Sequence, residues 1–81
     1  MSERMPSLAA LRAFEACARS ASFSAAAREL NVTPAAVAQQ VRALEKDLGV
    51  PLAIRAGRGI ELTGDGLALA RDLSAGFDTI R

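Results

Sequence analysis

The sequence predicts a mainly α-helical fold with one small β-hairpin. Ala, Leu, Arg and Glu, which are strong helix formers, dominate the composition. Apolar residues recur at helical spacing over most of the chain, but this spacing changes to alternation between residues 52 and 62. The length of 81 residues suits a single small domain.

Two helices are predicted in the first third of the chain. Ser7 can cap a helix from residue 8 to about 19, and Ser24 can cap a shorter helix over 25–30. Asn31 tolerates the left-handed conformation that ends a helix. The apolar face of the first helix is formed by Leu8, Leu11, Phe14 and Ala18.

The third helix has the clearest boundaries. Thr33 is a favourable N-cap, and Pro34 at the first helical position needs no hydrogen-bond donor. The helix is predicted over 34–48, because Gly49 can end it and Pro51 prevents its continuation. Its narrow apolar stripe consists of Val37, Val41, Leu44 and Leu48.

A hairpin and a last helix complete the pattern. Leu52 and Ile54 alternate with other residues, as do the residues from 60 to 62, and the segment 56–59 between them reads as a turn. Thr63 can then cap an amphipathic helix that reaches the chain end. The stripe of this helix is formed by Leu67, Ala70, Leu73, Phe77 and Ile80.

The composition argues against an enzyme or a metal protein. There is no His, and the single Cys17 can form neither an internal disulfide nor a Cys–His pair. We therefore expect no catalytic residue, no metal site and no cofactor. No stretch approaches the roughly 18 apolar residues of a membrane span, and no signal peptide is evident, so a cytoplasmic chain with no membrane partner is expected.

The joint between the second and third helices suggests a helix-turn-helix. Only about three residues, 31–33, separate the two helices, and the alanines at 25–27 are small enough for close approach. Leu30, Val32 and Val37 can fill the wedge between the helices. Spacing alone fits a generic helical bundle equally well.

The outer face of the third helix and the hairpin could both contact DNA. At about 100° per residue, the face opposite the apolar stripe carries Ala35, Ala38, Gln39, Arg42 and Lys46. Gln can read adenine, and Arg can read guanine or hold phosphate. Arg55 and Arg58 could reach the phosphate backbone from the glycine-rich turn. Ordinary solvated surfaces remain the alternative for both sets.

The charges are mildly asymmetric. Residues 33–58 carry four basic and two acidic side chains, whereas residues 59–81 carry two basic and four acidic ones. This places the positive charge near the third helix and the hairpin, although a net charge of +1 for the chain says little about partners by itself.

The residues resemble one known family over positions 6–81. The run 23–45 resembles the helix-turn-helix signature of LysR-type transcription regulators. The segments 48–52 and 62–66, with Arg55 and Arg58, resemble the wing and the start of the linker helix in that family. The resemblance implies a winged helix-turn-helix followed by a linker helix.

The resemblance also implies a function and a division of the chain. Residues 1–63 would form a sequence-specific DNA-binding domain, and residues 64–81 a truncated linker helix that pairs two chains as a homodimer. The effector domain, the part of such regulators that would bind a small molecule, would be absent. The implied dimer contacts are Leu67, Ala70, Leu73, Phe77 and Ile80. The implied DNA contacts are Ser24, Thr33, Pro34, Ala35, Ala38, Gln39, Gln40, Arg42, Arg55 and Arg58.

Four positions depart from the family pattern. Pro34 stands where the family usually has Gln, Ala38 where it has Ser, and Ala53 where a Phe anchors the wing. Gln39 often replaces a basic residue. Direct readout would then depend on Gln39, Gln40 and Arg42. A winged-helix module for protein–protein contact, which needs no basic recognition face, remains the alternative function, and a structural fragment with no function of its own is a third.

Overall fold

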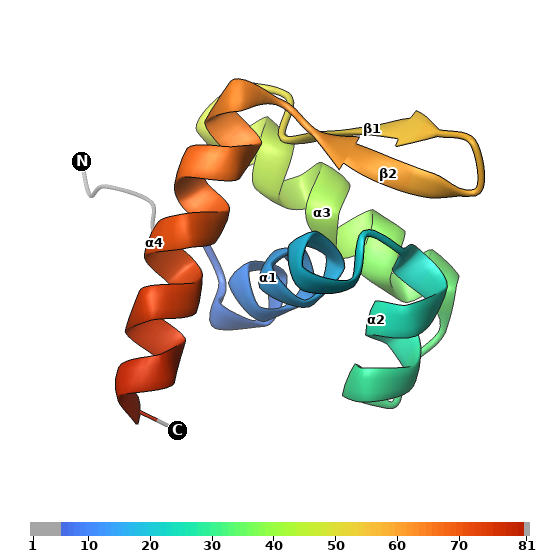
Figure 1. Ribbon diagram of the computed structural model, residues 1–81, viewed down its shortest axis with the longest axis horizontal. Helices are drawn as coiled ribbons and strands as arrows, with labels where there is room; N and C mark the ends of the chain where they lie inside the picture. Colours follow the sequence, from blue (N-terminus) through green and yellow to red (C-terminus); the bar gives the residue numbers. More distant parts are fainter. Residues whose placement is uncertain (1–5, 81) are drawn as a thin grey trace.

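The computed structural model describes residues 6–80 as four helices and a two-stranded hairpin (Figure 1). This confirms the predicted fold class. Residues 1–5 and residue 81, which belong to the predicted divisions 1–63 and 64–81, lie outside the described residues. The elements are α1 Leu8–Ser20, α2 Phe23–Leu30, α3 Pro34–Leu48, β1 Ala53–Ala56, β2 Gly59–Leu62 and α4 Gly64–Ile80.

Most helix ends lie where their capping residues predict. The Ser7 hydroxyl accepts a hydrogen bond from the Ala10 N–H at 3.0 Å, and the Thr33 hydroxyl accepts one from Ala36 at 3.1 Å. Asn31 and Gly49 adopt the left-handed conformation, with φ of 61° and 75°. These hydrogen bonds satisfy backbone groups that a helix end would otherwise leave unpaired.

The start of α2 differs from the prediction. Ser22, not Ser24, is the N-cap, and its hydroxyl accepts a hydrogen bond from the Ala25 N–H at 3.1 Å. The reason lies in Ala21, which ends α1 in the left-handed conformation with φ of 56°. The chain reverses there, so α2 begins at Phe23 and places Ser24 in its first turn.

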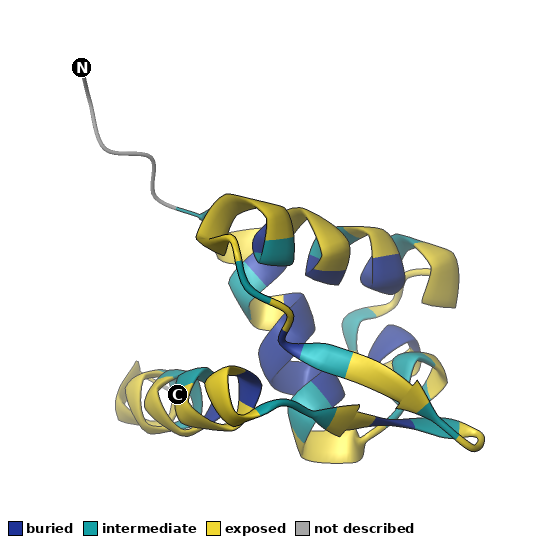
Figure 2. Cartoon of the chain, turned by 90° about the horizontal axis from the view of Figure 1, so that it is seen from above, coloured by how far each residue is buried: buried dark blue, intermediate teal, exposed yellow. Residues whose placement is uncertain are grey.

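The core forms around α1, which packs against α2, α3 and α4. Its largest fully buried side chains are Phe14, Leu44, Leu52, Val37 and Cys17. Figure 2 shows buried residues on the inward sides of the helices. Four members of the predicted apolar stripes are exposed. Leu8 and Leu48, near helix ends, are 63% and 43% exposed, and Leu67 and Ile80 on α4 are 45% and 78% exposed.

The hairpin is held at its base by α3. Antiparallel pairing joins Ala53 to Leu62 and Arg55 to Ile60. A carboxylate oxygen of Glu45 accepts hydrogen bonds from the N–H groups of Leu52, at 2.8 Å, and Ala53, at 3.2 Å. Glu45 therefore fixes the start of β1 relative to α3.

The last helix is fastened to the rest of the domain near its start. The Thr63 hydroxyl accepts a hydrogen bond from the Gly66 N–H at 3.0 Å, as predicted for a cap. A Cβ at Gly66 would collide with the backbone of Leu52, so only glycine permits this close approach.

A second attachment joins the middle of α4 to α1. The Ser74 hydroxyl donates a hydrogen bond to the buried Glu15 carboxylate at 2.9 Å. Glu15 also accepts two hydrogen bonds from Arg19, which in turn binds Glu29 on α2 at 2.8 Å. One ionic network therefore links α1, α2 and α4. Within residues 6–80, no helix is long and apolar enough to cross a membrane.

Candidate nucleic-acid interface

A tight joint connects α2 and α3. The N–H of Val32 donates a hydrogen bond to the Ala27 carbonyl at 3.0 Å, which folds the connection back onto α2. Ala26 and Ala27 are buried and small, so α2 and α3 can pack closely. This is the geometry of a helix-turn-helix, in which the second helix presents its outer face to a partner.

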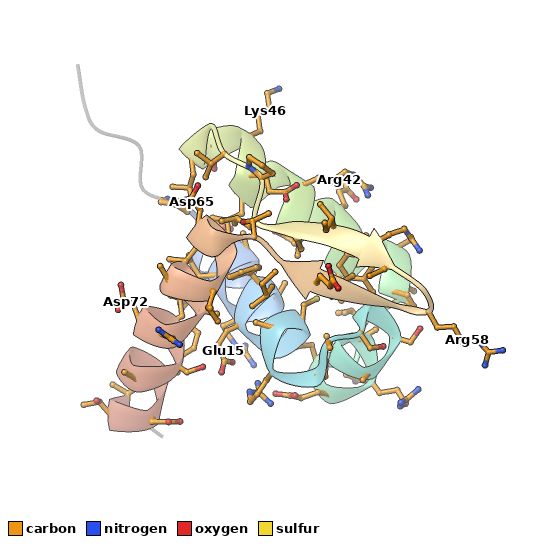
Figure 3. All side chains as sticks on the ribbon, turned by 45° about the horizontal axis from the view of Figure 1, so that its top comes forward. Glu15, Arg42, Lys46, Arg58, Asp65 and Asp72 are labelled. Atoms are coloured by element: carbon orange, nitrogen blue, oxygen red, sulfur yellow. The ribbon has the colours of Figure 1, made fainter. Side chains whose placement is uncertain are left out.

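The exposed face of α3 carries four of the expected residues. Ala35, Gln39, Arg42 and Lys46 are all exposed. In Figure 3, Arg42 and Lys46 project outward from α3. These four side chains are small, polar or positively charged, so this face can approach the phosphates of a duplex without electrostatic repulsion.

Two predicted site residues on α3 are not part of its exposed face. Ala38 is only 7% exposed and faces the wing, because the hairpin covers the angle between the buried stripe and the outer face. Gln40 is half-buried beside Arg12 and Val32, in a hollow between α1 and the α2–α3 joint. The helical angle alone did not separate these positions from Gln39 and Arg42.

A surface groove forms where α2, α3 and the wing meet. It has a volume of about 320 Å³ and contains the first turns of both helices. Six of the predicted DNA contacts meet here: Ser24, Pro34, Ala35, Ala38, Arg55 and Arg58. The remaining lining residues are Ser22, Phe23, Gly59 and Ile60. Two arginines beside two helix N-termini make this groove suitable for an anion such as a DNA phosphate.

A second, smaller hollow lies between α3 and the wing. It has a volume of about 220 Å³ and is lined by both Ala38 and Ala53, beside Arg42, Glu45 and Arg55. Ala53 is half-buried at the position where the family resemblance implies a Phe. The small side chain of Ala53 leaves this hollow open. The hydrogen bond from the Ala53 N–H to Glu45 fixes the strand there but does not fill the hollow.

Phe23 and Glu45 are residues of this site that the sequence did not identify. The Arg55 guanidinium carbon lies 5.7 Å from the centroid of the Phe23 ring. Glu45 binds the wing across a gap of seven positions in the chain. The aromatic at the start of α2 was a possible signal, since the chain has only three Phe, but no local spacing rule predicts its contact with the wing.

The remaining titratable groups of note are structural. Burial raises the pKa of the Cys17 thiol to about 11, so the thiol stays protonated and weakly nucleophilic. Hydrogen bonds from Arg19, first to Glu15 and then to Glu29, raise the pKa of its guanidinium. Among residues 6–80, no group of three His, Cys, Asp or Glu side chains could hold a metal ion.

The helix-turn-helix and its basic hairpin define a class: the chain has a winged helix-turn-helix fold of the DNA-binding kind. Residues 8–67 match the family described as "Bacterial regulatory helix-turn-helix protein, lysR family". The chain therefore belongs to the LysR family of bacterial regulators. This confirms the resemblance seen in the sequence.

Curated relatives are similar over nearly the whole chain. The chain is 58% identical over 78 residues to the "AhcY transcriptional activator HvrB" of Rhodobacter capsulatus, which covers 96% of this chain and 27% of that protein. It is 61% identical over 77 residues to the "HTH-type transcriptional activator AmpR" of Providencia stuartii, covering 95% of this chain and 26% of that one. The chain thus spans about a quarter of the length of these relatives.

Solved structures share the fold. A complex of the CbnR DNA-binding domain with DNA superposes with a TM-score of 0.82 at 38% identity, covering 91% of this chain and 85% of that one. A complex of the BenM DNA-binding domain with catB site 1 DNA gives a TM-score of 0.84 at 27% identity, covering 91% and 82%. Two of the similar structures are therefore DNA complexes of isolated domains of about this size.

Proposed function

We propose that this chain binds double-stranded DNA sequence-specifically, as the DNA-binding domain of a bacterial transcription regulator. The observation that supports this most directly is the groove at which α2, α3 and the wing converge, lined by Arg55 and Arg58. Arg42 is exposed on the outer face of α3, outside this groove. In this proposal α3 enters the major groove and the wing follows the phosphate backbone.

Each part of the interface has a distinct task. Gln39 and Arg42 supply the donors and acceptors that read base edges, and the small Ala35 lets α3 approach closely. Thr33 and Pro34 set the start of α3 at the groove, since the Thr33 hydroxyl is already engaged as its cap. Ser24 and the wing arginines bind phosphate. Ala38 and Gln40 support the helix from its flanks, so they contribute to the fold more than to readout.

The remaining parts of the proposal concern the whole protein. The named relatives are transcriptional regulators, so we propose a cytoplasmic regulator that performs no catalysis and needs no cofactor. Two chains would pair through α4. A small-molecule effector would act through a separate domain, as expected from the resemblance.

Binding to DNA can be tested by salt-dependent retention. The chain should be retained on calf-thymus DNA and elute as salt rises, because binding to phosphates releases counterions. The decisive variant removes three interface charges: Arg42→Ala, Arg55→Ala and Arg58→Ala together. The matched control removes three exposed charges away from the interface: Arg12→Ala, Arg28→Ala and Arg71→Ala together.

The two triple variants have the same net charge, so they separate a local site from general attraction. We expect the interface variant to elute at much lower salt than the control. Equal elution of the two variants would contradict the proposed interface. Absence of any retention of the native chain would favour a winged-helix module for protein–protein contact.

A further inference from the structure

The wing carries an arginine on its inward face. Arg55 pairs directly with Ile60, and directly paired residues of antiparallel strands point to the same side of the hairpin. Ile60 is only 9% exposed and belongs to the core. The Arg55 side chain therefore leaves the strand on the side that faces the helices, although the residue is exposed to solvent.

The ring of Phe23 lies under this arginine. The distance of 5.7 Å between the guanidinium carbon and the ring centroid is within the range of a cation–π contact. Among residues 6–80, no carboxylate lies within ion-pair distance of Arg55. The ring is therefore the side chain that explains where the guanidinium lies.

Wing and ring are fastened to the same turn. The carbonyl of Ala21 accepts a hydrogen bond from the Ile60 N–H at 3.2 Å. A Cβ at Gly59 would lie 2.6 Å from that same carbonyl oxygen, so the absence of a side chain lets β2 come this close. Phe23 follows Ala21 by two residues. The turn between α1 and α2 thus sets the distance between the wing and the aromatic ring.

We propose that Phe23 is a positioning residue for DNA binding, whose ring holds the Arg55 guanidinium over the groove in readiness for a phosphate of duplex DNA. The groove that Phe23 and Arg55 both line also contains Ser24 and Arg58. A free arginine side chain loses rotamer freedom when it binds, so an arginine held in place beforehand binds more tightly. This inference rests on the proposed function.

The test is a double-mutant cycle on DNA affinity. The dissociation constant for one mixed-sequence duplex is measured by fluorescence anisotropy, with and without Phe23→Leu, in the native, Arg55→Ala and Arg58→Ala backgrounds. We expect Phe23→Leu to weaken binding by about two- to five-fold in the native and Arg58→Ala backgrounds, the value of an exposed cation–π contact. In the Arg55→Ala background it should cause no further loss.

The salt dependence distinguishes positioning from charge. Phe23→Leu should leave the salt slope unchanged, because the arginine charge remains, whereas Arg55→Ala should lower it by about one unit. Phe23→Tyr retains the ring and should bind like the native chain. Thermal unfolding of each variant verifies folding, and Phe23→Met replaces Phe23→Leu in the cycle if the leucine variant does not fold.

The possible outcomes are distinguishable. An equal loss in all three backgrounds would overturn the role of Phe23 and leave it a core residue only. A Phe23→Tyr variant that binds as weakly as Phe23→Leu would overturn it as well. If the native chain bound no duplex at all, the proposed function itself would fail together with this inference.

Discussion

Arg42 is exposed on α3 and has no ion-pair partner among the described residues. Its guanidinium is therefore available to a base or a phosphate without first breaking an internal contact. Of the three residues expected to perform direct readout, Gln40 is half-buried in the hollow between α1 and the α2–α3 joint, whereas Gln39 and Arg42 are exposed. We therefore expect base readout to depend on Gln39 and Arg42.

Replacement of Arg42 measures this dependence. Arg42→Ala should weaken binding by about 1–3 kcal/mol if the side chain reads a base, and by less if it holds a phosphate. Isotherms are compared on a duplex selected from a random pool by the native chain and on a scrambled duplex. Arg71→Ala, the same change on the exposed side of α4, serves as the control. Unchanged affinity for both duplexes would remove Arg42 from the interface.

Among the glycines, Gly66 leaves the least room for a Cβ. The Cβ of Gly66→Ala would collide with the backbone of Leu52, which cannot rotate away as a side chain can. Overpacking of this kind typically costs about 1–3 kcal/mol of unfolding free energy. Urea denaturation provides the measurement.

Gly76 offers the matched control for that measurement. It lies on the same helix, and a Cβ there would meet nothing within 4 Å. Gly76→Ala should raise the unfolding free energy by up to about 1 kcal/mol, because alanine favours the helix. Equal effects of the two substitutions would show that the contact between α4 and the wing base is not close.

At the scale of elements, the wing is positioned from two sides. Glu45 on α3 binds its base, and the turn before α2 binds β2 through Ala21. The hairpin is therefore fixed in position relative to α2 and α3. Its two arginines should act on DNA mainly as charges, since phosphate contacts carry little sequence information.

The double variant Arg55→Ala and Arg58→Ala tests how the wing acts. It should weaken binding to selected and scrambled duplexes about equally and flatten the salt slope by about one to two units. Affinity is measured over a series of salt concentrations for both duplexes. An unchanged slope with an altered sequence preference would show that the wing reads bases.

Sequence reasoning predicted the elements whose ends are decided locally. Ser7, Thr33 and Gly49 terminate helices through hydrogen bonds within one turn, so their residue types were sufficient. The choice between Ser22 and Ser24 was not local. The position of this cap depends on Ala21, which adopts an unfavourable left-handed conformation. The carbonyl of Ala21 accepts a hydrogen bond from Ile60, a wing residue far away in the sequence.

The candidate site was predictable to a similar extent. A helical period gives the angle of each residue on α3, but it does not say which neighbouring element covers that angle. Arg42 and Gln39 lie far enough from the buried stripe to be exposed in any arrangement. Ala38 lies at an intermediate angle, and the wing, whose position depends on long-range contacts, covers it.

At the scale of the whole molecule, the expected dimer stripe on α4 is partly used inside the chain. Ala70 is buried, Leu73 packs against the core, and Phe77 lines a hollow with α1. Contacts between α1 and α4 therefore extend beyond Leu73, to Ser74 and Phe77. Leu67 and Ile80 remain exposed and available to a partner.

We expect the chain to dimerise weakly through α4, with dissociation in the micromolar range or above, about that of small transient interfaces. Pairing would place two α3 helices about 34 Å apart on one face of the duplex. Analytical ultracentrifugation compares the native chain with Ile80→Asp, which alters a side chain that is 78% exposed and leaves the core intact. Dimers of equal strength in both would locate the interface elsewhere, and monomers at every concentration would exclude it for this chain.

The two attachments of α4 have a mechanical consequence. Gly66 fits against Leu52 near the start of the helix, and Ser74, about 12 Å further along by helical rise, binds Glu15. A rod clamped at two points cannot pivot about either one. A torque applied to the far end of α4 would thus rotate the whole domain, including α3. It would not be absorbed by bending at residue 63.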